Sequence, residues 1–266
     1  MPTRDEAFEI SVGDHRIAAT LIVPDTRMPG VLFLHGWGGN QTQYAPRARE
    51  IAALGCACLT VDMLGHAKTQ PRQAAVTRAH NLQDAVAAYD ALVAESDVDA
   101  NKIAVIGSSY GGYLATILTS MRPVRWLALR APALYKDSDW DVPKLRLREV
   151  QSLEKYRRTV IDPKNNRALG AATRFKGDVL IVESGSDVVI PHEVIDNYRA
   201  AFIQARSLTY RLLDGADHGL TDPSCRLAYT TMLVNWITEM ISGARTVDVP
   251  SQKRVQEAMK SQAAMK

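Results

Sequence analysis

A serine flanked by glycines follows one of the apolar runs of the sequence. The run at 102–107 leads into Gly-Ser-Ser-Tyr-Gly at 107–111, after which the pattern has helical period. This G-x-S-x-G arrangement between a strand and a helix places its middle residue on a sharp turn, where flanking glycines avoid steric collisions. Ser109 is therefore the predicted nucleophile, and the alternative is a glycine-rich turn without chemistry.

A serine hydroxyl is a weak nucleophile unless a base accepts its proton, so this chemistry needs a histidine. His218 follows the last apolar run, lies between Gly215 and Gly219, and comes late in the chain, as the order serine, aspartate, histidine requires. His218 is the predicted base. The other histidines are His15, His35, His66, His80 and His192. His35 and His66 are expected to shape loops.

An acid must orient that histidine, and it should lie in the loop after the next-to-last strand. The run at 179–184 leads into Gly-Ser-Asp-Val-Val-Ile-Pro at 185–191, which makes Asp187 the candidate. Four other aspartates compete with it. Asp162 lies in a predicted insertion, Asp214 and Asp217 lie close to the histidine in sequence, and Asp222 is the expected N-cap of the final helix.

Negative charge that develops on a substrate oxygen needs two N–H donors, forming an oxyanion hole. Tyr110, after the nucleophile and at the positive end of a helix, supplies one. The loop His-Gly-Trp-Gly-Gly at 35–39 lets the backbone approach a substrate, so the Trp37 N–H is the second expected donor. This loop lacks the glycine patterns that cradle phosphates. The chemistry needs neither a metal ion nor an organic cofactor, and none is predicted.

Strands and helices alternate along the chain. Apolar runs typical of strands buried on both faces are Val31–His35, Ala57–Asp62, Lys102–Gly107, Arg125–Ala131, Val179–Ser184 and Leu208–Leu213. Segments of helical period are Gln43–Leu54, Arg78–Glu95, Tyr110–Met121, Pro191–Ala205 and Ser224–Ile241. An alternating pattern at Phe8–Val23 predicts an antiparallel hairpin. The predicted fold class is α/β, with a mostly parallel central sheet, helices on both faces, and the chemistry at the carboxyl ends of the strands.

One interval breaks this alternation. Residues 133–174 are charged, contain Pro143 and Pro163, and show one helical stretch near Lys144–Arg158. The interval is too long for an ordinary connection and is predicted to be a small cap insertion over the site. Residues 1–243 form one predicted domain that includes this insertion, and residues 244–266 are a polar tail that we expect to be mobile.

The composition disfavours several classes of protein. The 266 residues are 46% hydrophobic and 23% charged, which is typical of a globular chain with one large core. The net charge of +3 comes from scattered basic residues, which disfavours nucleic-acid binding. The acidic N-terminus has no signal-like apolar stretch and no segment has the hydropathy of a membrane span, so a soluble, cytoplasmic protein is expected. The odd number of cysteines, Cys56, Cys58 and Cys225, indicates reduced thiols.

The order of these motifs resembles that of the α/β-hydrolase superfamily over about residues 8–241. The matching segments are His-Gly-Trp-Gly-Gly at 35–39, Asp-x-x-Gly-His at 62–66, Gly-Ser-Ser-Tyr-Gly-Gly at 107–112, Gly-Ser-Asp at 185–187 and Asp-His-Gly at 217–219. The Ser-Tyr-Gly-Gly-Tyr turn is similar to that of the prolyl-oligopeptidase branch and its small esterases and acyl hydrolases. The segment Asp-Met-Leu-Gly-His-Ala-Lys at 62–68 departs from the usual strand-four motif, which has an arginine and a second glycine.

This resemblance implies a serine hydrolase of carboxylesterase type, in which Ser109, His218 and Asp187 form a catalytic triad and an acyl-enzyme is hydrolysed by water. The hydrolase hairpin begins where peptidases of that branch carry a β-propeller, which favours an esterase over a small peptidase. A serine nucleophile, rather than aspartate or cysteine, argues against haloalkane dehalogenase and dienelactone hydrolase chemistry.

Two rival functions remain open. The first is a thioester hydrolase or acyltransferase for an anionic carrier substrate, and the second is a non-catalytic protein that uses the fold as a ligand pocket. The first is suggested by basic residues of the insertion, which a solvated helix face explains equally well; they are Lys144, Arg146, Arg148, Lys155, Arg157 and Arg158. The expected partner is a small ester or thioester, and a homo-oligomer is left open.

Overall fold

An antiparallel hairpin begins the fold. The computed structural model describes residues 3–24 and 28–243, and its first strands are β1 (Thr3–Val12) and β2 (His15–Pro24). They are joined by a turn in which Gly13 has a φ of 56°, a conformation that glycine adopts without strain. β2 then pairs antiparallel with β4 (Ala57–Asp62). The predicted hairpin is therefore confirmed, and it extends the central sheet.

The other strands complete one sheet, which has eight strands within the described residues, in the order β1-β2-β4-β3-β5-β6-β7-β8. These strands are β3 (Met28–Leu34), β5 (Val98–Ser108), β6 (Trp126–Arg130), β7 (Asp178–Ser184) and β8 (Ser207–Leu213). All neighbouring pairs from β4 to β8 are parallel. The predicted α/β fold class with a mostly parallel sheet is confirmed.

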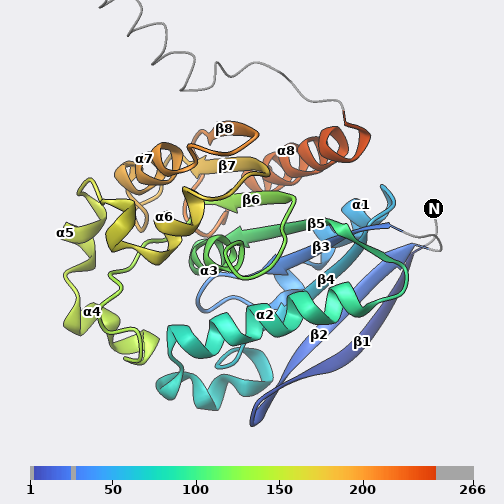
Figure 1. The fold of residues 1–266 in the computed structure, drawn as a ribbon, viewed down its shortest axis with the longest axis horizontal. Helices are drawn as coiled ribbons and strands as arrows, with labels where there is room; N and C mark the ends of the chain where they lie inside the picture. Colours follow the sequence, from blue (N-terminus) through green and yellow to red (C-terminus); the bar gives the residue numbers. More distant parts are fainter. Residues whose placement is uncertain (1–2, 25–27, 244–266) are drawn as a thin grey trace, which may run out of the picture.

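Helices cover both faces of the sheet (Figure 1). The first face packs against α2 (Arg78–Ala94), α3 (Tyr110–Leu118), α6 (Arg167–Ala172) and α7 (His192–Ala201), and the second against α1 (Ala45–Ala52) and α8 (Pro223–Ser242). Because successive side chains of a strand point to opposite faces of the sheet, each face has its own cluster of buried apolar side chains. In β3, Leu32 belongs to the cluster on the first face and Phe33 to the cluster on the second. Each such buried side chain contributes about 1.5–3 kcal/mol to folding.

The predicted helices exist, but their ends differ. α1 begins at Ala45 because the residues before it form a 3₁₀ turn, η1 (Gln41–Gln43), capped by the side chain of Asn40. Another 3₁₀ helix, η2 (Ala67–Ala75), was not predicted from the polar sequence that follows β4. The expected N-cap of the final helix is confirmed, because the Asp222 carboxylate accepts a hydrogen bond from the Ser224 N–H at 2.6 Å.

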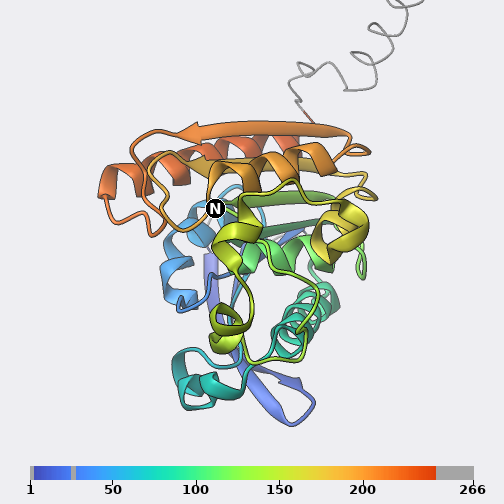
Figure 2. The same cartoon turned by 90° about the vertical axis from the view of Figure 1, so that its left-hand side faces the viewer.

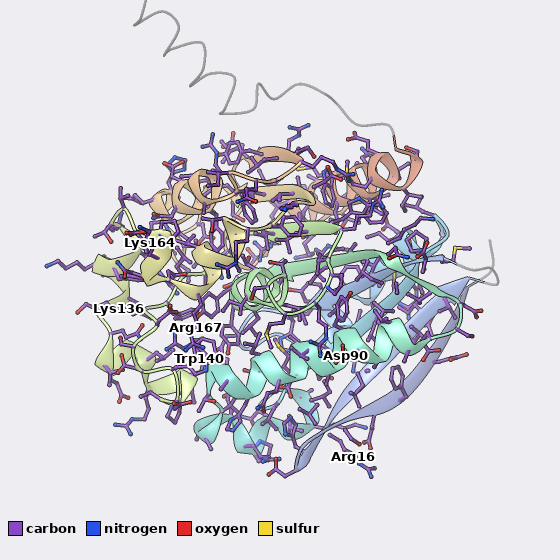
Figure 3. The ribbon with its side chains drawn as sticks, viewed as in Figure 1. Arg16, Asp90, Lys136, Trp140, Lys164 and Arg167 are labelled. Atoms are coloured by element: carbon purple, nitrogen blue, oxygen red, sulfur yellow. The ribbon has the colours of Figure 1, made fainter. Side chains whose placement is uncertain are left out.

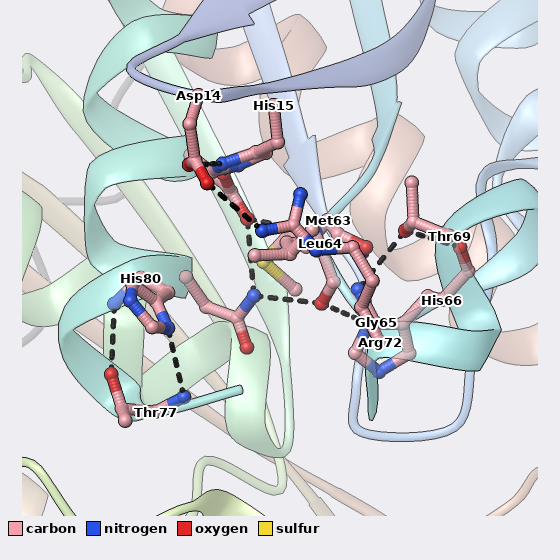
Figure 4. A network of polar contacts seen from close by, with 12 residues as sticks. Asp14, His15, Met63, Leu64, Gly65, His66, Thr69, Arg72, Thr77 and His80 are labelled. Carbon is pink, nitrogen blue, oxygen red and sulfur yellow. Dashed lines mark hydrogen bonds and ion pairs between the residues drawn. The ribbon is translucent and has the colours of Figure 1, made fainter. Parts of the chain in front are cut away.

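A buried polar network ties the hairpin to α2 and to the loop after β4 (Figure 4). The Asp84 carboxylate is fully buried, accepts hydrogen bonds from the Leu64 N–H at 2.8 Å and the Asn81 amide at 3.0 Å, and lies 2.6 Å from His15 Nε2. The hydrogen bond to Asp84 raises the pKa of His15. These partners come from the hairpin, from the loop after β4 and from α2, so the satisfied carboxylate links the three segments beneath the loops of the site.

The insertion at 133–174 folds as short helical pieces between β6 and β7. They are η3 (Lys144–Arg146), α4 (Leu147–Val150), α5 (Leu153–Arg157), η4 (Pro163–Asn165) and α6. The predicted single helix at 144–158 is wrong. Buried Gln151 interrupts it, because its side-chain amide donates to the carbonyls of Lys136 and Ser138 at 3.3 and 3.0 Å.

The apolar side chains of the insertion pack on the α2 and α3 face of the sheet. Leu147, Leu153 and Ile161 belong to the core cluster of that face. On the outside, the Arg167 guanidinium lies 4.2 Å from the Trp140 ring centroid, and Figure 3 shows these two side chains together. Figure 2 turns this part of the chain toward the viewer. The insertion is therefore anchored to one face of the sheet.

Cys56, Cys58 and Cys225 are free thiols, as predicted, and burial raises the pKa of Cys56 to about 12. None of the described helices is long and apolar enough to span a membrane. The predicted C-terminal tail, residues 244–266, lies outside the described residues.

Candidate active site

Ser109 lies on the sharp turn between β5 and α3. Its φ of 51° and ψ of −115° are outside the regions that a serine ordinarily adopts. Glycine is required on both sides of it: a Cβ on Gly107 would lie 2.5 Å from the Gly111 carbonyl oxygen, and a Cβ on Gly111 would lie 2.1 Å from that of Leu34. Close backbone packing therefore holds the serine in a strained conformation that projects its hydroxyl from the turn.

The structure brings Ser109, His218 and Asp187 into one hydrogen-bonded chain. His218 Nε2 lies 3.0 Å from Ser109 Oγ, and His218 Nδ1 lies 2.7 Å from Asp187 Oδ2. The imidazole is 23% exposed and the carboxylate 3% exposed, so the histidine can be reached from outside while its carboxylate partner is shielded. This is the geometry in which an imidazole can remove a proton from a serine hydroxyl.

Asp187 is held ionised at its position. Burial alone would raise its pKa, but the hydrogen bond from His218 and those from the Ile190 and Val189 N–H groups together lower it. Both N–H groups donate to Oδ1 at 2.8 Å, which leaves Oδ2 for the imidazole. The carboxylate thus fixes the tautomer that carries its proton on Nδ1 and leaves Nε2 free to accept one.

The competing aspartates have other partners. Asp162 accepts from the Lys164 N–H, Asp214 from the Gly215 N–H, and Asp217 from the Thr221 N–H and hydroxyl. Together with the helix cap at residue 222, these contacts leave residue 187 as the one aspartate, among the described residues, that bonds His218.

Arg130, at the end of β6, was not identified from the sequence as part of the site. Its Nη1 donates to Ser184 Oγ at 3.1 Å and its Nη2 donates to the His218 carbonyl at 2.8 Å. The guanidinium therefore links β7 to the backbone of the loop that carries the imidazole. The signal in the sequence was one arginine that ends an otherwise apolar strand.

The loop after β3 lies directly beside the serine turn. A Cβ on Gly36 would lie 3.4 Å from Ser109 Cβ, and the Trp37 ring packs edge-on against Tyr110, 5.5 Å between centroids. Within the described part of the chain, the Trp37 and Tyr110 N–H groups have no hydrogen-bond acceptor. The loop that carries Trp37 thus lies beside the serine turn, and the oxyanion hole stays a prediction.

His35 and His66 join loops, as predicted, rather than the serine. His35 Nδ1 lies 2.8 Å from the Gly36 carbonyl, and its Nε2 accepts from the Met63 N–H at 3.1 Å. Burial, followed by the nearby His66, lowers the pKa of His35 to about 3, so the ring is neutral and can accept that bond. The atypical segment at 62–68 is therefore locked to the loop that carries Trp37.

A cleft of about 600 Å³ opens beside Ser109 and His218. Its walls come from the loop at 36–39, from the end of β6, from the histidine loop, and from α1 and the start of α8. The two helices belong to the second face of the sheet. No described residue of the insertion lines this cleft, although Lys144 of the insertion contacts the rings of Trp37 and Tyr110. A cap over the site therefore stays a prediction. The apolar side chains of the insertion hold it against the opposite face.

Four of the basic residues of the insertion have partners within the protein, two of them in exposed ion pairs. Lys144 Nζ lies 4.8 to 5.3 Å from the ring centroids of Trp37, Tyr135 and Tyr110. Arg157 Nε donates to the Leu134 carbonyl at 3.1 Å. Two others form exposed ion pairs, Arg146 with Glu149 and Arg158 with Glu193.

Among the described residues, no group of three or more His, Cys, Asp or Glu is placed to hold a metal ion.

Known proteins resemble this chain in sequence and in fold. Two uncharacterized proteins of Mycobacterium tuberculosis, from strains CDC 1551 and H37Rv, are each 29% identical over 192 residues, which cover 71% of this chain and 63% of theirs. The chain thus spans less than two thirds of these relatives. Residues 28–166, more than half of the chain, match the family described as serine aminopeptidase, S33.

Solved structures extend the likeness to most of the fold. Dienelactone hydrolase from Anabaena variabilis has a TM-score of 0.64 and 21% identity, with 89% of this chain and 98% of that one covered. Est1E from Butyrivibrio proteoclasticus, bound to ferulic acid, gives 0.69 and 18%, with 89% and 100% covered. Puromycin hydrolase gives 0.70 and 18%, with 93% and 40% covered. The chain belongs to the serine aminopeptidase family (S33) and has the α/β-hydrolase fold that these structures share.

Proposed function

We propose that this chain is a serine hydrolase that cleaves carboxylic esters, as a carboxylesterase does. The supporting observation is the bridge that His218 makes between Ser109 Oγ, at 3.0 Å, and Asp187, at 2.7 Å. A strained serine turn and two backbone donors without acceptors surround that bridge. Together these groups supply a nucleophile, a base, an orienting acid and an oxyanion hole.

The reaction proceeds in two halves. In the first, His218 Nε2 takes the proton of the Ser109 hydroxyl as Oγ attacks the carbonyl carbon, and the Trp37 and Tyr110 N–H groups stabilise the negative oxygen. The imidazolium then gives its proton to the leaving alcohol, which departs and leaves an acyl-serine. In the second half, water loses a proton to the same nitrogen, attacks the acyl carbon, and releases the carboxylic acid with the serine hydroxyl restored.

Amide hydrolysis is the second candidate, favoured by the name of the matching family and by the fold shared with puromycin hydrolase. Ester cleavage is placed first because an alcohol leaves more readily than an amine. Turnover of p-nitrophenyl acetate, compared with amino-acid p-nitroanilides, separates the two. The free thiols favour the cytoplasm as the site of action, because proteins of oxidising compartments more often pair their cysteines in disulfides.

Replacing the nucleophile tests the proposal. Ser109→Ala should abolish both p-nitrophenyl acetate hydrolysis and labelling by a fluorophosphonate probe, whereas Ser120→Ala, after the end of α3, should retain both. Undiminished turnover in Ser109→Ala would remove this serine from the mechanism. Absence of label and of turnover in the folded wild-type protein would favour a non-catalytic ligand-binding role.

A further inference from the structure

The cleft beside Ser109 is lined by three arginines from different parts of the chain. Arg47 comes from α1, Arg130 from the end of β6, and Arg226 from the first turn of α8. Arg47 is 9% and Arg130 is 7% exposed, whereas Arg226 is exposed at the rim. Two buried cations and a third at the mouth thus face the same space as the hydroxyl.

These guanidinium groups are held by neutral partners. Arg47 donates from Nε to Thr230 Oγ1 at 3.0 Å and from Nη1 to the Gln43 carbonyl at 3.2 Å, and its Cζ lies 5.0 Å from the Tyr229 ring centroid. Arg226 Nη1 donates to two carbonyls of the loop that carries the histidine. Each arginine has five N–H donors, so these bonds orient the groups without using all of their donors.

Among the described residues, no carboxylate forms a direct ion pair with these arginines, although Arg130 lies close enough to Asp217, and Arg226 to Asp222, for their charges to interact. Two acids of the same loop, half-buried Asp217 and exposed Asp222, bond to threonine and serine groups of their own segment and do not line the cleft. Burying an arginine without an anionic partner is costly. An anion that enters the cleft would supply the missing partner.

We infer that the preferred substrate is an ester that carries an anionic group, a carboxylate or a phosphate, which binds these arginines while the scissile carbonyl lies at Ser109. The inference rests on the proposed esterase function and narrows its substrate class. Arginine suits both anions because its planar fork donates two parallel hydrogen bonds to them. The cleft volume of about 600 Å³ suits a small-molecule ester.

Matched ester pairs test this inference on the wild-type protein. Monomethyl succinate against methyl butyrate places the charge on the acyl side, and 3-acetoxybenzoate against 3-methylphenyl acetate places it on the alcohol side. Hydrolysis is followed by pH-stat at low salt and in 0.5 M NaCl. We expect kcat/KM for the anionic ester to exceed that for its neutral partner by about tenfold in one pair, and to lose that advantage at high salt. Equal or faster turnover of the neutral ester in both pairs would overturn the inference.

Charge-removing variants locate the effect. Arg226→Gln, at the exposed rim, and Arg47→Gln should each lower the anionic-to-neutral ratio of kcat/KM by about tenfold. Arg49→Gln is the control, because it removes the same charge from an exposed position of the same helix, where Arg49 pairs with Asp5; it should leave the ratio unchanged. A ratio unchanged in Arg226→Gln, the variant least able to disturb folding, and in folded Arg47→Gln would contradict the inference.

The failure of the inference and that of the proposed function give different results. If neutral esters are hydrolysed and the fluorophosphonate probe labels Ser109 while neither anionic ester is preferred, the substrate class alone is wrong. If no ester is hydrolysed and no label forms on the folded protein, the esterase proposal fails first.

Discussion

The two sides of the serine turn use basic residues in opposite ways. On the insertion side, Lys144 is enclosed by three aromatic rings and Arg157 donates to backbone carbonyls, so these cations hold protein segments together. On the α1 and α8 side, Arg47 and Arg226 line an open cleft without a carboxylate partner. A basic residue can serve a ligand only where the protein has left its charge uncompensated, which sequence clustering alone does not reveal.

The largest effect on activity is expected from Asp187, in the site that lies between the insertion side and the α1 and α8 side. Asp187→Asn should lower kcat for p-nitrophenyl acetate by about 10⁴-fold, because an amide no longer holds the imidazole in the tautomer that accepts the serine proton. Steady-state kinetics check this, with Asp214→Asn as the control in the neighbouring loop. A drop of less than tenfold would mean that another acid orients His218.

On the insertion side, a buried arginine should matter for stability. Arg157→Ala removes hydrogen bonds to the Leu134 and Val189 carbonyls and should lower the free energy of unfolding by about 3 kcal/mol. Arg158→Ala, which removes an exposed ion pair, should change it by less than about 0.5 kcal/mol. Urea unfolding of both variants measures the difference, and equal effects would show that burial does not distinguish the two arginines.

A smaller loss is expected for the lysine among the aromatic rings. Lys144→Met keeps the aliphatic stem but removes the charge near Trp37, Tyr110 and Tyr135, and should lower the free energy of unfolding by about 1 kcal/mol. The ratio of anionic to neutral ester turnover should stay unchanged in folded Lys144→Met. If the ratio in Lys144→Met falls by as much as is expected for Arg226→Gln, the basic residues on the two sides of the site do not differ in the way that the structure indicates. Thermal unfolding, with Lys155→Met as the exposed control, completes the test.

The smallest effect concerns pH. Because the folded-state pKa of Asp187 is depressed, its ionised form contributes stability that is fully present above the unfolded value of about 3.9 and is lost as the pH falls through the folded value. The difference in unfolding free energy between wild type and Asp187→Asn should therefore shrink as the pH falls below about 4. A difference that grows with acidity would mean that the folded-state pKa is raised instead.

Local sequence rules predicted most of the elements and missed what depends on distant partners. The G-x-S-x-G segment between an apolar run and a helical pattern predicted the turn at Ser109, because its glycines are needed within a few residues. The single helical stretch predicted near Lys144–Arg158 is broken at Gln151, whose side chain bonds a segment more than ten residues earlier. No local pattern contains that contact.

The residues of the candidate site also divide into those that local motifs predict and those that depend on contacts between distant parts of the chain. The order of Ser109, Asp187 and His218 in strand-following loops predicted which residues to consider, and the structure brings these three together. Their catalytic roles remain the proposal that the kinetics above would test. Arg130 was missed because one arginine at the end of an apolar run carries no motif, and its contacts to Ser184 and to the histidine loop span 54 and 88 residues.

By itself, the sequence determined the α/β class, the strand-following loops and the strained serine turn, since period, glycine placement and strand composition act over short stretches of chain. Only the tertiary structure decided which face the insertion covers and which cations remain without a counter-charge. Those features depend on burial and on hydrogen bonds between residues that are far apart in the chain, and the free energy of a charge depends on what surrounds it in space.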